Sequence, residues 1–169
     1  MASYLRTPMQ SAMPLNSRQR DNSWILAWNK SSFLELGPHE AAPGIARSHI
    51  RDVLPGWGLE RYEESAQLVA TELLTNSIQA VRALLLPEPP PVRLWLLGAP
   101  SQVMVSVWDP VPAVPQPRNA EVYDESGRGL FIVTHYSANC GYFFPPPEYA
   151  PDFQGGKVTW AIVRTNPHD

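Results

Sequence analysis

The 169-residue chain has 44% hydrophobic residues and carries 13 Lys and Arg against 16 Asp and Glu, a formal net charge of -3. This composition predicts one globular domain with one core, and the lack of a basic block excludes nucleic acid as an expected partner. One cysteine, Cys140, excludes an internal disulfide, and no apolar run approaches the ~20 residues of a membrane span, so we expect a cytoplasmic protein without membrane contact.

The first 22 residues are polar and show no sustained period, so we expect a mobile tail ahead of a domain at residues 23–166. Apolar residues between Trp24 and Leu36 then predict a strand at a sheet edge or an interface. Packing within the monomer is the default expectation for this strand, and a homodimer contact is the alternative.

Two helices are expected next. The first runs from Ala41 to Leu54 and is closed by Pro55 and the glycines that follow it. The second runs from about Glu60 to Leu86, because its apolar positions form one stripe when each residue turns the helix by about 100°. That stripe consists of Ala66, Val69, Ala70, Leu73, Leu74, Ser77, Val81 and Leu84.

Alternating residues predict two strands after the prolines at 87–91. The first covers residues 92–97 and is turned by residues 98–101. The second covers residues 103–109, where a period of two places three valines and Asp109 on the same inward face. A carboxylate at the end of a buried row requires a structural or functional reason.

The C-terminal part of the chain predicts a third helix, from residue 127 to about residues 139–141, and a short strand at 142–144. Gly155-Gly156 then turns into a last strand, residues 158–163. The order of elements predicts an α+β fold: a two-layer α/β sandwich with a mixed, mostly antiparallel sheet and three helices on one face.

Glu72 and Asn76 are the first candidate site residues. On a helix they stand about 40° apart and one turn removed, so both can face one cleft. An amide oxygen there can hold a hydrated magnesium ion, while the carboxylate polarises a hydroxyl. A solvent-facing polar pair is the alternative interpretation, and spacing alone favours it.

Asp109 and the glycines near residue 128 are further candidates. Asp109 can accept a hydrogen bond from the exocyclic amine of adenine, or it can cap the backbone before Pro110. Gly127 and Gly129 at a helix start can direct backbone amides at a phosphate, or serve only as a turn. Arg128, or Arg118 in the preceding loop, could add positive charge to that site; either could equally be a solvated surface arginine.

Taken together and in this order, these motifs resemble the GHKL family of ATP-binding proteins. Residues 71–77 (Thr-Glu-Leu-Leu-Thr-Asn-Ser) are similar to its N box, residues 107–109 to its first glycine box, and residues 125–130 (Glu-Ser-Gly-Arg-Gly-Leu) to its second. Residues 155–160 resemble its closing strand. The resemblance covers about residues 33–164 and is greatest to the anti-sigma-factor serine kinases.

The resemblance implies a Bergerat-type fold that binds ATP and magnesium. By position, Asn76 would hold magnesium, Glu72 would be the catalytic base and Asp109 would recognise adenine. Phosphate and nucleotide contacts would come from the second glycine box and the closing strand, with the residues Gly127, Arg128, Gly129, Leu130 and Thr159.

Two functions follow from the resemblance, and they involve the same partners. The first is a serine/threonine protein kinase that phosphorylates a serine on an anti-anti-sigma (STAS-type) protein. The alternative is a non-catalytic module that binds such a protein or a sigma factor, and it is motivated by a departure from the family. Asp109 is followed by Pro110, Val111 and Pro112 where the family has glycines, and proline removes an amide donor and fixes its own φ. An ATPase clamp ranks last, because such clamps need a transducer domain.

Overall fold

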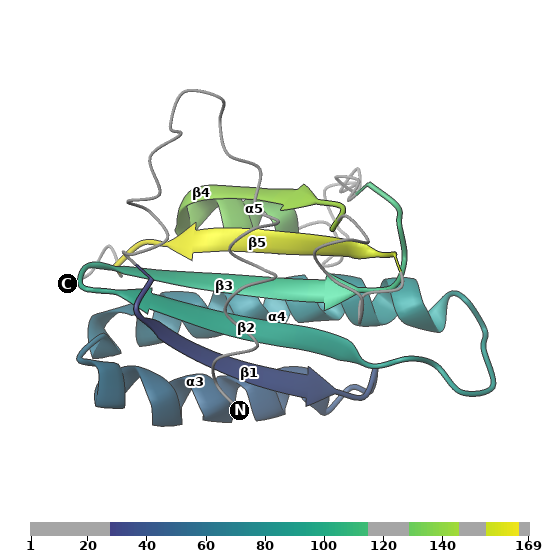
Figure 1. The fold of residues 1–169 in the computed structure, drawn as a ribbon, viewed down its shortest axis with the longest axis horizontal. Helices are drawn as coiled ribbons and strands as arrows, with labels where there is room; N and C mark the ends of the chain where they lie inside the picture. Colours follow the sequence, from purple (N-terminus) through teal and green to yellow (C-terminus); the bar gives the residue numbers. More distant parts are fainter. Residues whose placement is uncertain (1–27, 115–128, 146–154, 166–169) are drawn as a thin grey trace.

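Five strands form one sheet in the computed structural model, which describes residues 28–114, 129–145 and 155–165 (Figure 1). Every neighbouring pair in the sheet is antiparallel. In spatial order the strands are β1 (Lys30–Leu36), β2 (Val92–Ala99), β3 (Gln102–Asp109), β5 (Lys157–Val163) and β4 (Ser137–Phe143).

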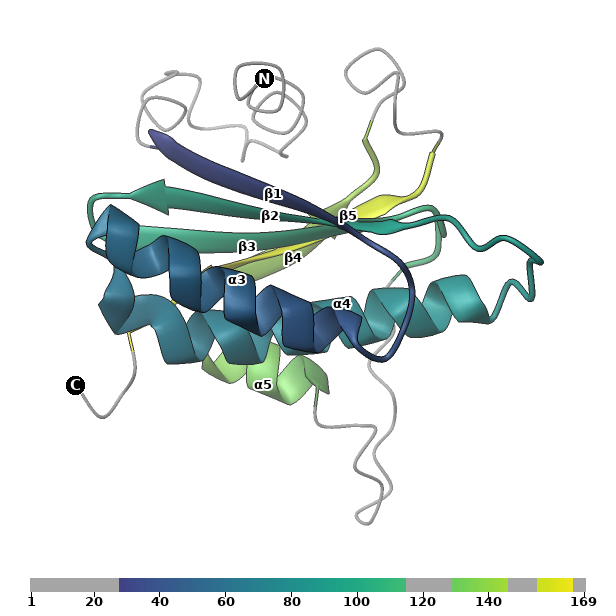
Figure 2. The same ribbon diagram turned by 90° about the horizontal axis from the view of Figure 1, so that it is seen from below.

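The described residues form three α-helices, and these lie on one face of the sheet (Figure 2). α3 (Ala42–Trp57) contacts β1 and β2, α4 (Glu63–Arg82) packs mainly on β3, and α5 (Gly129–His135) contacts β4. A short 3-10 turn, Glu60–Tyr62, leads into α4. The predicted α+β two-layer sandwich with helices on one face is therefore confirmed.

The main core lies between the sheet and the helices. Val103, Val105 and Val107 are fully buried there, against α4 residues such as Leu74. Asp109 shares their face of β3, and it too is fully buried. The predicted inward row of three valines and one carboxylate is confirmed.

The opposite face of the sheet carries a second apolar cluster, which we call the outer-face cluster. Alternation explains it, because the residues of β2 that do not face the helices are Arg93 and three apolar residues, Trp95, Leu97 and Ala99. The cluster consists of Trp28, Trp95, Leu97, Ala99, Met104, Trp108, Phe143 and Val158.

The predicted strand before residue 36 is shorter than expected but sits where it was expected, as the edge strand β1. The predicted tail, residues 1–22, lies outside the described residues. Between β2 and β3 the turn is also tighter than predicted, because positions 98 and 99 belong to β2.

The predicted end of the first helix at residue 54 is wrong. α3 runs to Trp57 and includes Pro55 in its last turn. Gly58 ends it instead, in a left-handed conformation with φ 69°, and its backbone N–H bonds to the carbonyls of Leu54 and Pro55. Pro55 has no backbone N–H to bond to the carbonyl four residues earlier, so this last turn lacks one helical hydrogen bond.

The second helix also has different bounds. α4 ends at Arg82 rather than residue 86, and Leu84, which was assigned to the buried stripe, is 43% exposed. Leu85 has a positive φ of 53°, which α-helical geometry does not allow. The other apolar positions named for that stripe are buried.

The third helix is the largest correction. α5 ends at His135, and residues 137–143, part of which was expected to be helical, form β4. Tyr136 marks the switch: its N–H closes the helix on Ile132, and its carbonyl accepts from the N–H of Arg164 just beyond β5. Pairing with β5 therefore overrides the local helix signal.

Candidate functional site

Glu72 and Asn76 lie on the side of α4 that faces α5. Thr71 accepts a hydrogen bond from Arg47 of α3 at 3.4 Å, which identifies the α3 side of the helix. At about 100° per residue, Glu72 and Asn76 are turned away from that side, and α4 contacts α5. Helical geometry thus places both residues on the flank of α4 that faces away from α3.

The two side chains differ in their surroundings. Glu72 is half-buried and Asn76 is exposed. Burial raises the pKa of the Glu72 carboxyl above its ordinary value. A half-buried carboxylate with a raised pKa is a better proton acceptor than one in open solvent, and an exposed amide oxygen remains accessible to a hydrated cation.

Asp109 lies at the end of β3, where it pairs with Lys157, the first residue of β5. Figure 1 shows this end of β3 on the same side of the molecule as the C-terminal part of α4. α5 ends next to the far end of β5, so its first residue, Gly129, points back toward the same side. The end of β3, the C-terminal part of α4 and the start of α5 therefore lie toward the same side of the molecule.

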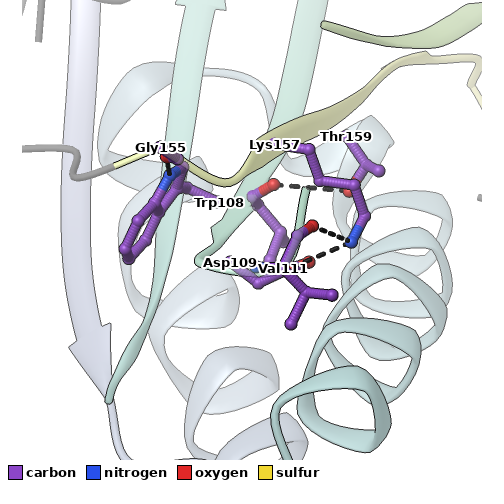
Figure 3. Close-up of polar contacts among 7 residues, drawn as sticks. Trp108, Asp109, Val111, Gly155, Lys157 and Thr159 are labelled. Carbon is purple, nitrogen blue, oxygen red and sulfur yellow. Dashed lines mark hydrogen bonds and ion pairs between the residues drawn. The ribbon is translucent and has the colours of Figure 1, made fainter. Parts of the chain in front are cut away.

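The Asp109 carboxylate is already engaged on one oxygen. Its Oδ1 accepts from Lys157 Nζ at 2.9 Å and from the Val111 backbone N–H at 3.0 Å (Figure 3). The Val111 contact is the backbone cap that was the alternative interpretation of this aspartate. Lys157 Nζ also donates to the Val111 carbonyl at 3.1 Å.

The other carboxylate oxygen, Asp109 Oδ2, is buried without a hydrogen bond within the described ranges. An ammonium group has three N–H donors, and the structure shows two of those of Lys157 in use. The ion pair therefore presents one unused acceptor beside one further donor, which is the pattern that a nucleobase edge can match.

Lys157 is the site residue that sequence reasoning missed. The signal was present, because a period of two places it on the same face of β5 as Thr159, one of the predicted binding residues. What the sequence lacks is the strand register, which sets Lys157 opposite Asp109.

Thr159 is buried and donates to the Val107 carbonyl at 3.3 Å. Its hydroxyl therefore ties β5 to β3 two residues below the carboxylate. A hydroxyl keeps acceptor capacity after donating, so Thr159 can still accept one bond from a ligand or a water. The structure brings Thr159 and Asp109 onto the adjacent strands β5 and β3.

Gly156 lies against the backbone of Asp109. Its φ is +83°, and a Cβ at this position would lie 2.2 Å from the Asp109 carbonyl oxygen. Only glycine satisfies both constraints. The neighbouring Gly155 carbonyl accepts from Trp108 Nε1 at 3.1 Å (Figure 3), so the turn before β5 is fastened to the end of β3.

The structure describes little or nothing of the remaining predicted residues. Gly127 and Arg128 lie outside the described residues, and so does Arg118. Gly129 and Leu130 form the first turn of α5, with their side-chain surroundings not described. Among described residues, no hydrogen bond or ion pair joins Glu72 or Asn76 to Asp109.

The described residues contain neither a cluster of metal ligands nor a membrane-spanning helix. No group of three or more His, Cys, Asp and Glu side chains there could hold a metal ion. No helix there is long and apolar enough to cross a membrane. Comparison with protein-family models and with curated proteins finds no match to this chain.

Proposed function

We propose that this protein is an ATP- and magnesium-binding regulatory serine/threonine kinase of the anti-sigma-factor type. Its phosphoryl acceptor is a serine on an anti-anti-sigma (STAS-type) partner. The observation that carries the proposal is the buried Asp109 carboxylate, whose free oxygen lies at the end of the sandwich where the C-terminal part of α4 and the start of α5 also lie.

Asp109 supplies base recognition in this proposal. Its Oδ2 accepts a hydrogen bond from the exocyclic amine of adenine, while Lys157 stays on Oδ1. Burial of an unpartnered carboxylate oxygen costs free energy, so a ligand amine that reaches it recovers that cost. The same requirement discriminates against a purine with a carbonyl oxygen in place of the amine.

Glu72 and Asn76 supply the chemistry at the phosphate end. Magnesium, when bound, neutralises charge on the phosphates, and the exposed Asn76 amide oxygen is the residue to hold it. Glu72 accepts the proton of the partner's serine hydroxyl as the new oxygen–phosphorus bond forms and ADP leaves. Its raised pKa suits that role.

Labelled ATP tests the proposal. The protein is incubated with magnesium, γ-labelled ATP and the anti-anti-sigma protein encoded nearest to it, and label on that partner's serine is the expected result. Glu72→Gln is expected to reduce transfer at least a hundredfold while ATP binding persists. Glu64→Gln, an exposed carboxylate in the first turn of the same helix, is the matched control and should transfer at the wild-type rate.

A non-catalytic partner-binding module is the second candidate, and the Asp109–Lys157 ion pair favours it. The buried pair already occupies the Asp109 carboxylate, and the backbone of Gly156 lies too close to that of Asp109 and Pro110 to leave room for a side chain. A stable complex with the partner or with a sigma factor, together with no label on the partner, would select this function over the kinase.

A further inference from the structure

The outer face of the sheet is buried, although all three described α-helices pack on the other face. Trp95 is 3% exposed, Met104 2% and Val158 2%. No helix or strand within residues 28–114, 129–145 and 155–165 lies over this face (Figure 2). Side chains on this face cover one another in part. Arg93 stacks over the Trp108 ring at 4.9 Å, and the Phe33 and Trp95 rings are 5.1 Å apart.

We propose that residues 1–27 of this chain dock on the outer-face cluster and form its cover. The attachment point is Trp28, which is 5% exposed and belongs to the cluster. The three residues Trp24, Ile25 and Leu26 come immediately before it and offer apolar surface that matches the face. The preceding segment therefore starts on the surface that needs covering.

Length and attachment favour this segment over the others outside the described ranges. Fully extended, 27 residues reach about 90 Å, whereas an eight-residue strand such as β2 is about 26 Å long. Residues 115–128 connect the end of β3 to α5, which belongs to the helix layer. Residues 146–154 begin and end beside β4 and β5, at the sheet edge opposite β1.

Covering the outer-face cluster removes a large apolar surface from water. Each large apolar side chain taken from water stabilises the folded chain, and three tryptophans other than Trp28 lie in or against this cluster. A sheet face of that composition left open would be a strong site for self-association. The N-terminal cover thus acts as an intramolecular competitor of a dimer contact on this face.

Photo-crosslinking of the full-length protein tests the proposal. p-Benzoylphenylalanine replaces Phe33, which lies on β1 at the border of the cluster and is not fully buried. Irradiation is expected to give a product at monomer mass whose peptide map joins residue 33 to residues 1–27. The same label at Ile45, 52% exposed on the helix side, is the control and should not join to that segment.

Three results would overturn the proposal. They are a product at dimer mass, which would assign the face to a second copy, a crosslink to residues 146–154, and no crosslink to any segment. A second variant avoids dependence on the label: Trp24, Ile25 and Leu26 are all replaced by Ser in the full chain. It should bind several-fold more of a hydrophobic dye and elute as a larger species at high concentration, and unchanged dye binding would count against the cover.

Discussion

Asp109 and Lys157 form a buried ion pair that links β3 to β5. The Asp109 side chain is fully buried and that of Lys157 is 8% exposed. Such pairs gain less from attraction than they lose in desolvation, but removing one partner leaves an uncompensated charge in the interior. The stability of this corner therefore depends on keeping both residues or neither.

A double-mutant cycle measures this dependence. Lys157→Met keeps the bulk of the side chain and is expected to lower the free energy of unfolding by about 3–5 kcal/mol, because Asp109 loses its counter-charge. Adding Asp109→Asn should recover much of that loss. Urea unfolding of the four proteins checks the prediction, and purely additive effects would mean that the two side chains are not coupled.

The raised pKa of Glu72 predicts a pH dependence of stability. The folded chain holds a proton on this carboxyl at pH values where the unfolded chain has released it. The contribution of Glu72 to stability is therefore greatest below the unfolded pKa and falls as pH rises through the folded pKa. Glu72→Gln removes this term, so the stability of the variant relative to wild type should increase between about pH 4 and about pH 7. Unfolding curves of both proteins at the two pH values test this prediction. A difference in unfolding free energy that is the same at both pH values would contradict the effect of burial on Glu72.

The sequence predicted where a side chain lies only where the helix or strand repeat alone determines it. Alternation along residues 103–109 predicted the inward Asp109, and helical spacing predicted that Glu72 and Asn76 lie together at the edge of the buried stripe. Lys157 was not predicted as its partner, because the contact depends on the register between strands that are 48 residues apart. No local pattern contains that register.

Among the elements, α3 shows how a single glycine sets a helix end. Gly58 has φ 69°, and an added Cβ would meet no atom within 4 Å, so backbone conformation alone determines the cost of a side chain there. Gly58→Ala should lower the free energy of unfolding by about 1 kcal/mol.

Gly56 is the matched control, because it lies inside α3, is exposed and also has no atom within 4 Å of an added Cβ. Gly56→Ala should raise stability by up to about 1 kcal/mol through helix propensity. Thermal unfolding of both variants tests whether the two substitutions change stability in opposite directions. Equal effects would show that Gly58 is not the residue that ends the helix.

The errors in element bounds share a cause. Residues 137–139 were expected to end the third helix, yet they form β4, because the backbone groups there bond to β5. Leu84 continues the apolar spacing of α4 but lies beyond the helix layer, where no core remains to bury it. Tertiary contacts outweighed local signals at both places.

For the molecule as a whole, the fold class followed from the order of periodic segments, and the contact between Asp109 and Lys157 followed from the topology. The antiparallel order β1-β2-β3-β5-β4 brings the end of β3 beside the start of β5. It also gives the sheet a second apolar face, which the sequence encodes as apolar residues at both parities of β2. That pattern was visible in the sequence, but what covers the second face is not a periodic property.

Nucleotide binding is the step on which the proposed kinase depends, and calorimetric titration of the full-length protein with ATP measures it most directly. The expected result is micromolar binding that strengthens with magnesium, weakens in Asn76→Ala only when magnesium is present, and is lost in Asp109→Asn. ITP should bind at least tenfold more weakly than ATP. No heat of binding to ATP with magnesium, from a protein whose folded state is verified, would contradict the kinase. The Asp109–Lys157 pair would then be a structural ion pair in a non-catalytic partner-binding module.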